Sequence, residues 1–193
     1  MRLNVYLISH PIIRKLSTQI RYSISSNYYI QKKYRLLQNI YILLVYEVVR
    51  KWMKVNNIYI KNIDNIKELT LFTPKESYLI ITNLMNCGNI INEINDLLPK
   101  SYIQHLDCNQ NNIINDNCLD NEIIHIIQEA KIIIIDNVLT TSTNKLLHYL
   151  TQQKQIEISQ IKIICITCNN KVLETIGDKY PLLNIYTTKI YPY

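Results

Sequence analysis

The residues best suited to chemistry lie in the stretch 132–144, which reads IIIIDNVLTTSTN. Four isoleucines lead into Asp136 and Asn137, and a run of hydroxyl side chains follows. A strand that delivers a carboxylate to a helix start sets it beside free backbone N–H groups and a dipole that favours anions. Asp136 could then hold a sugar hydroxyl or help to place a divalent cation. The stretch predicts an anion site, while a helix cap or a plain turn explains the same residues structurally.

The elements that must position this stretch alternate between strands and helices. Buried apolar runs predict strands, and 3.6-residue spacing predicts helices. The expected strands are 78–84, 102–106, 131–136, 161–167 and 183–188, and the expected helices are 26–53, 89–98, 143–153 and 171–178. Continuous β-branched strands between helices are typical of a mostly parallel sheet covered on both faces. The fold class is therefore α/β with a small β-hairpin at 55–60 and 69–72, and ligands are expected past the carboxyl ends of the strands.

Composition limits the function further. A chain of 193 residues suits one domain, and its only glycines are Gly88 and Gly177, which argues against a glycine-rich phosphate cradle. The net charge of +6 permits a polyanionic partner, but the basic residues are scattered, which favours a solvated surface and makes nucleic acid an unfavoured partner. Five unevenly spaced cysteines fit a reducing compartment. No apolar run reaches the ~20 residues of a membrane span, so no membrane contact is expected.

Two patterns that suggest metal chemistry have plainer explanations. Cys165 and Cys168 form a C-x-x-C pair on an expected strand, where residues three apart face opposite sides. Zinc would also need a second pair. His105, His125 and His148 lack metal-ligand spacing. We therefore predict no metal site in the protein's own side chains and assign no catalytic residue.

Several motifs, taken in order, resemble the uracil phosphoribosyltransferase family. They are His10-Pro11-Ile12, Leu43-Leu44-Val45-Tyr46-Glu47, Ile135–Thr141, Lys162–Thr167, Tyr180-Pro181 and Ile185-Tyr186-Thr187. Their order and spacing hold nearly without gaps from His10 to Ile190. The resemblance implies a type I phosphoribosyltransferase-like fold with a long N-terminal helix, in one domain at 1–193. It also implies transfer of a phosphoribosyl group from phosphoribosyl pyrophosphate to uracil, yielding UMP and pyrophosphate, with Mg²⁺ as the cofactor of an active enzyme.

The same resemblance identifies site residues and departures. It implies phosphoribosyl pyrophosphate binding by Asp136, Asn137, Thr140, Thr141, Ser142, Thr143 and Asn144. Two family arginines fall on the uncharged Met85 and Gln110, and the family's phosphate-loop glycines fall on Ser142 and Thr143. The sequence stops at Tyr193, before the family's glycine-rich uracil loop would begin. Because this transfer depends on charge stabilisation and positioning, the departures predict impaired or lost catalysis.

Three functions remain open at this point. One is an active transferase, the second a degenerate homologue that still binds a phosphate or nucleotide, and the third a non-catalytic regulator that binds nucleotide or RNA on the same fold. The family also implies a homodimer, for which the apolar long helix could supply the contact. A resemblance that begins already at His10, together with a composition typical of an AT-rich genome, predicts an organelle-encoded protein of the plastid stroma.

Overall fold

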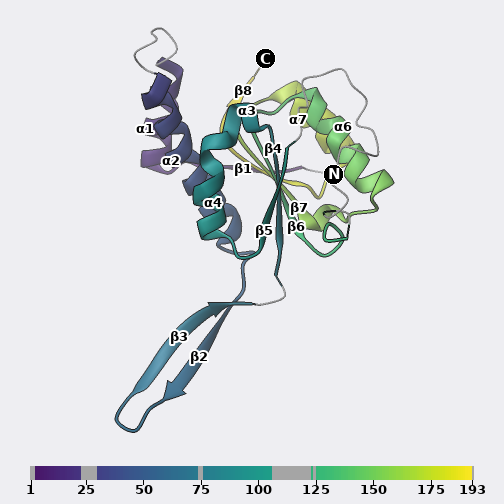
Figure 1. Cartoon of the computed structure of the whole chain (residues 1–193). Coiled ribbons are helices and arrows are strands. Elements are labelled where there is room, and N and C mark those ends of the chain that lie inside the picture. The colour runs from purple at the N-terminus through teal and green to yellow at the C-terminus, as the bar shows by residue number, and fades with distance from the viewer. Residues whose placement is uncertain (1–2, 23–29, 74–75, 106–122, 124, 193) are drawn as a thin grey trace.

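The computed structural model describes residues 3–22, 30–73, 76–105, 123 and 125–192. Its main feature is a six-stranded sheet in the order β1-β8-β7-β6-β4-β5, in which every neighbouring pair is parallel (Figure 1). The strands are β1 (Asn4–Leu7), β4 (Tyr78–Thr82), β5 (Ser101–His105), β6 (Lys131–Val138), β7 (Ile161–Asn169) and β8 (Asn184–Tyr191). This arrangement confirms the expected α/β fold with a mostly parallel sheet.

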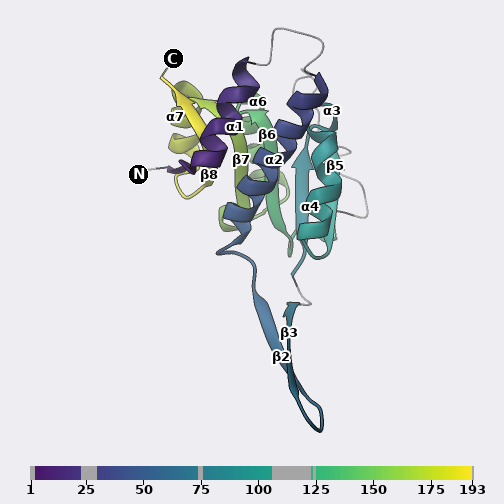
Figure 2. The same cartoon turned by 90° about the vertical axis from the view of Figure 1, so that its left-hand side faces the viewer.

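Helices cover both faces of the sheet (Figure 2). One face carries α1 (Pro11–Tyr22), α2 (Ile30–Val49), α3 (Leu84–Cys87) and α4 (Ile91–Leu97). The other carries α6 (Thr141–His148) and α7 (Asn170–Lys179). The remaining helical turns are η3 (Gly88–Ile90), η6 (Ile158–Gln160) and a π-helical turn η5 (Tyr149–Gln153) that continues α6. None of the helices in the described ranges is both long and apolar enough to cross a bilayer.

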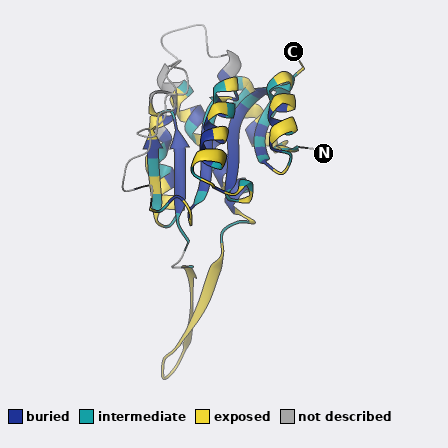
Figure 3. Ribbon diagram, turned by 90° about the vertical axis from the view of Figure 1, so that its right-hand side faces the viewer, coloured by how far each residue is buried: buried dark blue, intermediate teal, exposed yellow. Residues whose placement is uncertain are grey.

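The core lies in two layers, one on each face of the sheet (Figure 3). Along β6, Ile132 and Ile134 pack toward α6 and α7, whereas Ile133 and Ile135 pack toward α2. Each buried isoleucine contributes roughly 1.5–3 kcal/mol to folding. The apolar face of α2 packs against the sheet, since Ile40, Leu44, Val45 and Val48 are fully buried within the chain. A dimer contact through this helix stays a prediction, and only its exposed residues, among them Tyr34 and Tyr46, could make it.

Several boundaries differ from the expected ones. The sequence pattern revealed neither β1, a four-residue and mostly exposed edge strand, nor α1. The strand expected at 131–136 continues to Val138, so Asp136 lies within β6. The helix expected at 26–53 is described from Ile30 and ends at Val49, and the polar, asparagine-rich stretch 108–121 lies outside the described residues.

The β-hairpin projects away from the sheet (Figure 1). It consists of β2 (Val55–Lys61) and β3 (Ile66–Phe72), paired antiparallel with Ile58 opposite Leu69. Every residue of both strands is exposed. The hairpin is thus confirmed, but it has the opposite environment from the buried strands of the sheet.

Candidate functional site

The candidate site lies at the carboxyl ends of β6 and its neighbours. Asp136 is paired in register with Cys165 of β7, and Asn137 and Val138 complete β6. The Asp136 side chain is half-buried, and this burial raises the pKa of its carboxyl group above the ordinary value. Hydrogen bonds from the backbone of Asn137 and Val138 oppose the rise. The carboxylate is therefore positioned by the backbone next to the turn that leads into α6.

The start of α6 leaves polar atoms without protein partners. Thr140 occupies the N-cap position with extended backbone angles (φ −121°, ψ 170°), yet its side chain makes no capping hydrogen bond. Among the described residues, Thr140 Oγ1 and Asn144 Oδ1 are buried without a hydrogen-bond partner. A buried polar group left unpaired costs about 1–3 kcal/mol, and such groups call for a functional explanation. A ligand at this helix start could supply the missing partner.

The hydroxyl residues at the start of α6 become more buried along the chain. Thr141 is exposed, Ser142 is half-buried and Thr143 is 2 % exposed. Among the described non-glycine residues, a positive φ occurs at Lys100 and Gln155, and therefore not at Ser142 or Thr143. Ser142 and Thr143 thus fit this turn without the strain that would require glycine.

Tyr41 of α2 reaches the site from the opposite face of the sheet. Its hydroxyl donates a 2.6 Å hydrogen bond to Asn137 Oδ1, and Cys87 Sγ lies 4.0 Å from the same hydroxyl. Thr82 Oγ1 donates to the carbonyl of Ile135 at 2.9 Å, which ties the end of β4 to β6. Burial raises the pKa of Tyr41 well above its ordinary value, so the phenol stays a donor. Sequence analysis missed Tyr41 as a site residue. Its place on an apolar helix face was the available signal, because a buried tyrosine hydroxyl needs a partner.

Comparison with known proteins decides the family. The family model described as uracil phosphoribosyltransferase matches residues 7–192. The chain belongs to the uracil phosphoribosyltransferase family.

Individual relatives agree with this assignment. A protein named uracil phosphoribosyltransferase homolog from Porphyra purpurea is 27 % identical, covering 98 % of this chain and 89 % of its own length. A protein of the same name from Pyropia yezoensis is 28 % identical with the same coverage. Among solved structures, the AQ2163 protein of Aquifex aeolicus has a TM-score of 0.72 at 15 % identity, covering 96 % of this chain and 86 % of its own. Orotate phosphoribosyltransferase of Mycobacterium tuberculosis, in complex with phosphoribosyl pyrophosphate, has a TM-score of 0.50 at 9 % identity, covering 95 % and 91 %. These structures share the fold.

Of the two positions where the resemblance implies arginine, the structure describes only Met85. Met85 lies in α3, directly after β4, whereas Gln110 lies outside the described residues. His105 Nδ1 accepts a 3.0 Å hydrogen bond from the backbone N–H of Leu84 and so joins the ends of β4 and β5. In this member of the uracil phosphoribosyltransferase family, the turn after β4 is thus closed by a histidine, and it bears Met85 at the position where the resemblance implies an arginine.

The structure corrects the expectation that Cys165 and Cys168 face opposite sides. Both thiols are buried in the core layer beneath α6 and α7, while Ile166 packs on the other face. A hydrogen bond between them raises the pKa of Cys165 and lowers that of Cys168. Thr187 of β8 lies beside both groups: Cys168 Sγ donates to its Oγ1 at 3.8 Å, and this Oγ1 donates to the carbonyl of Ile166 at 3.3 Å.

Metal binding has little support from side chains alone. Within the described ranges, no three His, Cys, Asp or Glu residues are grouped as metal ligands. Asp136 is nevertheless the right kind of group for Mg²⁺, which takes one or two carboxylates and otherwise keeps water or substrate phosphate oxygens. A family member of this kind could hold Mg²⁺ at Asp136 only together with a phosphorylated ligand.

Proposed function

We propose that this chain, as one domain at 1–193, is a uracil phosphoribosyltransferase homologue that binds phosphoribosyl pyrophosphate with impaired or lost catalysis. The start of α6 is the observation that carries the proposal, because it combines an uncapped helix terminus with the buried, unbonded Thr140 Oγ1 and Asn144 Oδ1. Asp136 stands four residues before Thr140 and adds a carboxylate suited to ribose hydroxyls. The ligand's 5′-phosphate would sit at the helix start, among the residues from Thr140 to Asn144.

The impaired step would be departure of the pyrophosphate. Charge that develops on this leaving group is best stabilised by fixed cations, and the family's two arginines are replaced by Met85 and Gln110. Leaving one buried charge unpaired costs roughly 2–5 kcal/mol. When bound, Mg²⁺ would neutralise part of that charge, with Asp136 holding it through water. The chain's own residues would therefore bind and orient the ligand more effectively than they promote transfer.

Binding and turnover can be measured separately. Phosphoribosyl pyrophosphate with Mg²⁺ is expected to raise the melting temperature of the pure protein, while labelled uracil yields little or no UMP. Asp136→Asn should reduce the melting shift, and Asp178→Asn, at an exposed position of α7, should not. Rapid UMP formation would disprove impaired catalysis. If no ligand-induced shift occurs, the ligand assignment is wrong. Salt-sensitive RNA binding in its place would favour the non-catalytic regulator.

We also propose a homodimer, supported by the hairpin. The more apolar of its faces carries Ile58, Ile60, Leu69 and Leu71, all exposed, beside Asn56 and Lys67, and the opposite face also exposes Val55, Ile66 and Phe72. The other face carries a hydrogen-bonded polar group in which Glu68 accepts from Asn57 and Tyr59. A two-stranded hairpin is at best marginally stable alone in water. A second copy covering the apolar face would remove this surface from water.

Light scattering after size-exclusion chromatography tests the dimer. Wild type should have twice the chain mass, and Ile58→Asp should lower it toward one chain. Thr70→Asp, on the opposite face of the same hairpin, is the matched control and should remain dimeric. A wild-type monomer at high concentration, or equal masses for the two variants, would contradict the proposal.

We propose the plastid stroma as the location. The relatives from Porphyra and Pyropia are red algal proteins, and the composition rich in Ile, Asn, Lys and Tyr suits an AT-rich organelle genome. Immunodetection in fractionated cells, with plastid and cytosolic marker proteins, gives the answer. Enrichment in the cytosolic fraction would refute it.

A further inference from the structure

One lysine joins both legs of the hairpin to the sheet. Lys131 begins β6, and its Nζ donates to the carbonyl of Trp52 at 2.6 Å, on the leg that enters the hairpin. The same Nζ donates to Glu76 Oε1 at 2.7 Å, on the leg that leaves it. The side chains of Lys131 and Glu76 are only 20 % and 10 % exposed. A single ammonium group therefore bridges three segments in a place largely screened from water.

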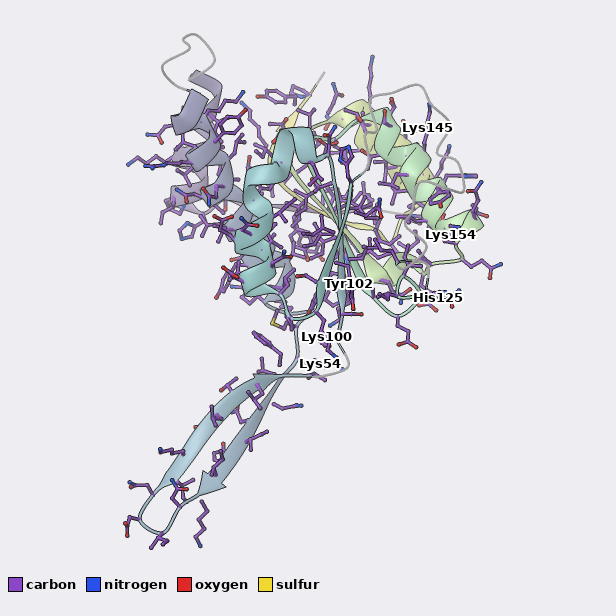
Figure 4. All side chains as sticks on the ribbon, in the orientation of Figure 1. Lys54, Lys100, Tyr102, His125, Lys145 and Lys154 are labelled. Carbon is purple, nitrogen blue, oxygen red and sulfur yellow. The ribbon has the colours of Figure 1, made fainter. Side chains whose placement is uncertain are left out.

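Glu76 uses its second carboxylate oxygen as well. Oε2 accepts from the backbone N–H of Lys54 at 3.3 Å and from the Tyr78 hydroxyl at 3.2 Å. The legs are also bonded directly, since Thr73 donates to the carbonyl of Lys54 from both its backbone N–H (3.3 Å) and its hydroxyl (3.1 Å). Figure 4 labels Lys54 at this junction between the hairpin and the sheet. The base of the hairpin is thus closed by hydrogen bonds that converge on one carboxylate.

The ring of Trp52 is fixed within the same cluster. Lys162 Nζ lies 4.2 Å from the ring centroid and Lys131 Nζ lies 5.6 Å from it. Tyr78 meets the ring edge-on, with centroids 6.3 Å apart and planes at 86°. Lys162 Nζ also donates to the carbonyl of Val48 at 3.3 Å, one residue before α2 ends. The ring of Trp52 therefore lies close to two cations, which arise from β6 and β7.

We propose that Lys131, Glu76 and Trp52 form a latch that fixes the hairpin to the amino end of the sheet and sets its direction. The strands of the hairpin are exposed along their whole length, so packing along the body does not orient them. Orientation must therefore come from the base, where these three residues lie. The latch acts far from the carboxyl ends of the strands, so it does not depend on the proposed function.

Hydrogen exchange followed by mass spectrometry on the full chain tests the latch. Lys131→Met should speed exchange of the amides in 54–73 by roughly tenfold or more, as expected for a local opening, while β6 and β7 stay protected. Emission of Trp52, the single tryptophan, should shift to longer wavelength as its ring becomes wetter. The matched control is Lys179→Met, at an exposed position of α7.

Glu76→Gln is the second variant, because it keeps the shape of the side chain and removes only its charge. It decides the matter if Lys131→Met fails to fold. Faster exchange confined to 54–73 would support the latch. The proposal is overturned if 54–73 exchanges at the wild-type rate in Glu76→Gln, or if the hairpin and the sheet strands accelerate equally. It is also overturned if the wild-type hairpin already exchanges as fast as an unstructured peptide.

Discussion

The two ends of the sheet differ in whether their buried polar groups have hydrogen-bond partners within the protein. At the amino end, Lys131 and Glu76 satisfy one another and the nearby backbone, and Lys162 bonds a carbonyl and covers an indole ring. At the carboxyl end, Thr140 and Asn144 keep buried oxygen atoms without protein partners. Pairing of this kind strengthens the folded state, whereas unpaired buried groups weaken it unless a ligand completes them. The polar groups at the amino end are thus paired within the protein, whereas those at the carboxyl end could still be paired by a ligand.

The largest expected effect comes from breaking the amino end. Glu76→Leu would leave the Lys131 ammonium group without its carboxylate in a site that is mostly buried. We expect the free energy of unfolding to fall by about 3 kcal/mol, the low end for a broken buried pair. Urea denaturation measures this, with Glu129→Leu, at an exposed position, as the control. A loss no larger than that of the control would show that the pair contributes little.

A comparable effect should appear as a pH dependence. Burial lowers the pKa of Lys162 from 10.5 to about 8, and the charge of Lys131 adds to this shift. Because Lys162 keeps its proton in the unfolded chain when the folded form has already lost it, the contribution of Lys162 to stability should rise between about pH 8 and 10, by up to about 3 kcal/mol. Within that window the raised pKa values of Cys87 and Cys165 act in the opposite direction, and above it those of Tyr41, Tyr78 and Tyr186 do so too. Denaturation across this pH range should show that the free energy of unfolding of wild type, measured relative to that of Lys162→Met, rises with pH. A difference that does not change with pH would assign any slope of wild type to other groups.

At the carboxyl end, a smaller loss is expected from Tyr41→Phe. This change removes the donor that holds Asn137 Oδ1 at 2.6 Å, in a fully buried position. The free energy of unfolding should fall by about 1–2 kcal/mol. Tyr34→Phe, on the exposed surface of α2, should have no measurable effect in the same denaturation experiment. Equal stabilities of the two variants would mean that the Asn137 contact is dispensable.

The smallest expected change in the free energy of unfolding is an increase. Thr140→Val removes a buried hydroxyl that has no partner among the described residues, so stability should rise by up to about 1 kcal/mol. The melting shift caused by phosphoribosyl pyrophosphate should shrink at the same time. Thr151→Val is the contrasting control, since its hydroxyl donates to the carbonyl of Leu147 at 2.8 Å and its loss should destabilise. A destabilised Thr140→Val would remove the contrast between the two ends.

How well the sequence predicted a feature depended on how local its cause was. The strand ending near Asp136 and the exposed hairpin were foreseen, because a run of isoleucines and a turn flanked by β-branched residues act within a few positions. The bond between Tyr41 and Asn137 joins residues 96 positions apart, which no local pattern encodes. The pairing of Cys165 with Cys168 was missed since strand alternation was assumed to be unbroken. The residues proposed for the ligand, from Asp136 to Asn144, stay a prediction.

The placement of β1 has a consequence for how the molecule is assembled. Its sheet partner is β8, with Asn4 opposite Asn184, so β1 cannot pair until a segment about 180 residues further along the chain has been made. Contacts between such distant segments form slowly, because a long stretch of chain has to be restrained first. The edge of the sheet therefore closes at the end of folding. Until then, a nascent chain displays an unpaired strand that chaperones or a neighbouring nascent chain can capture.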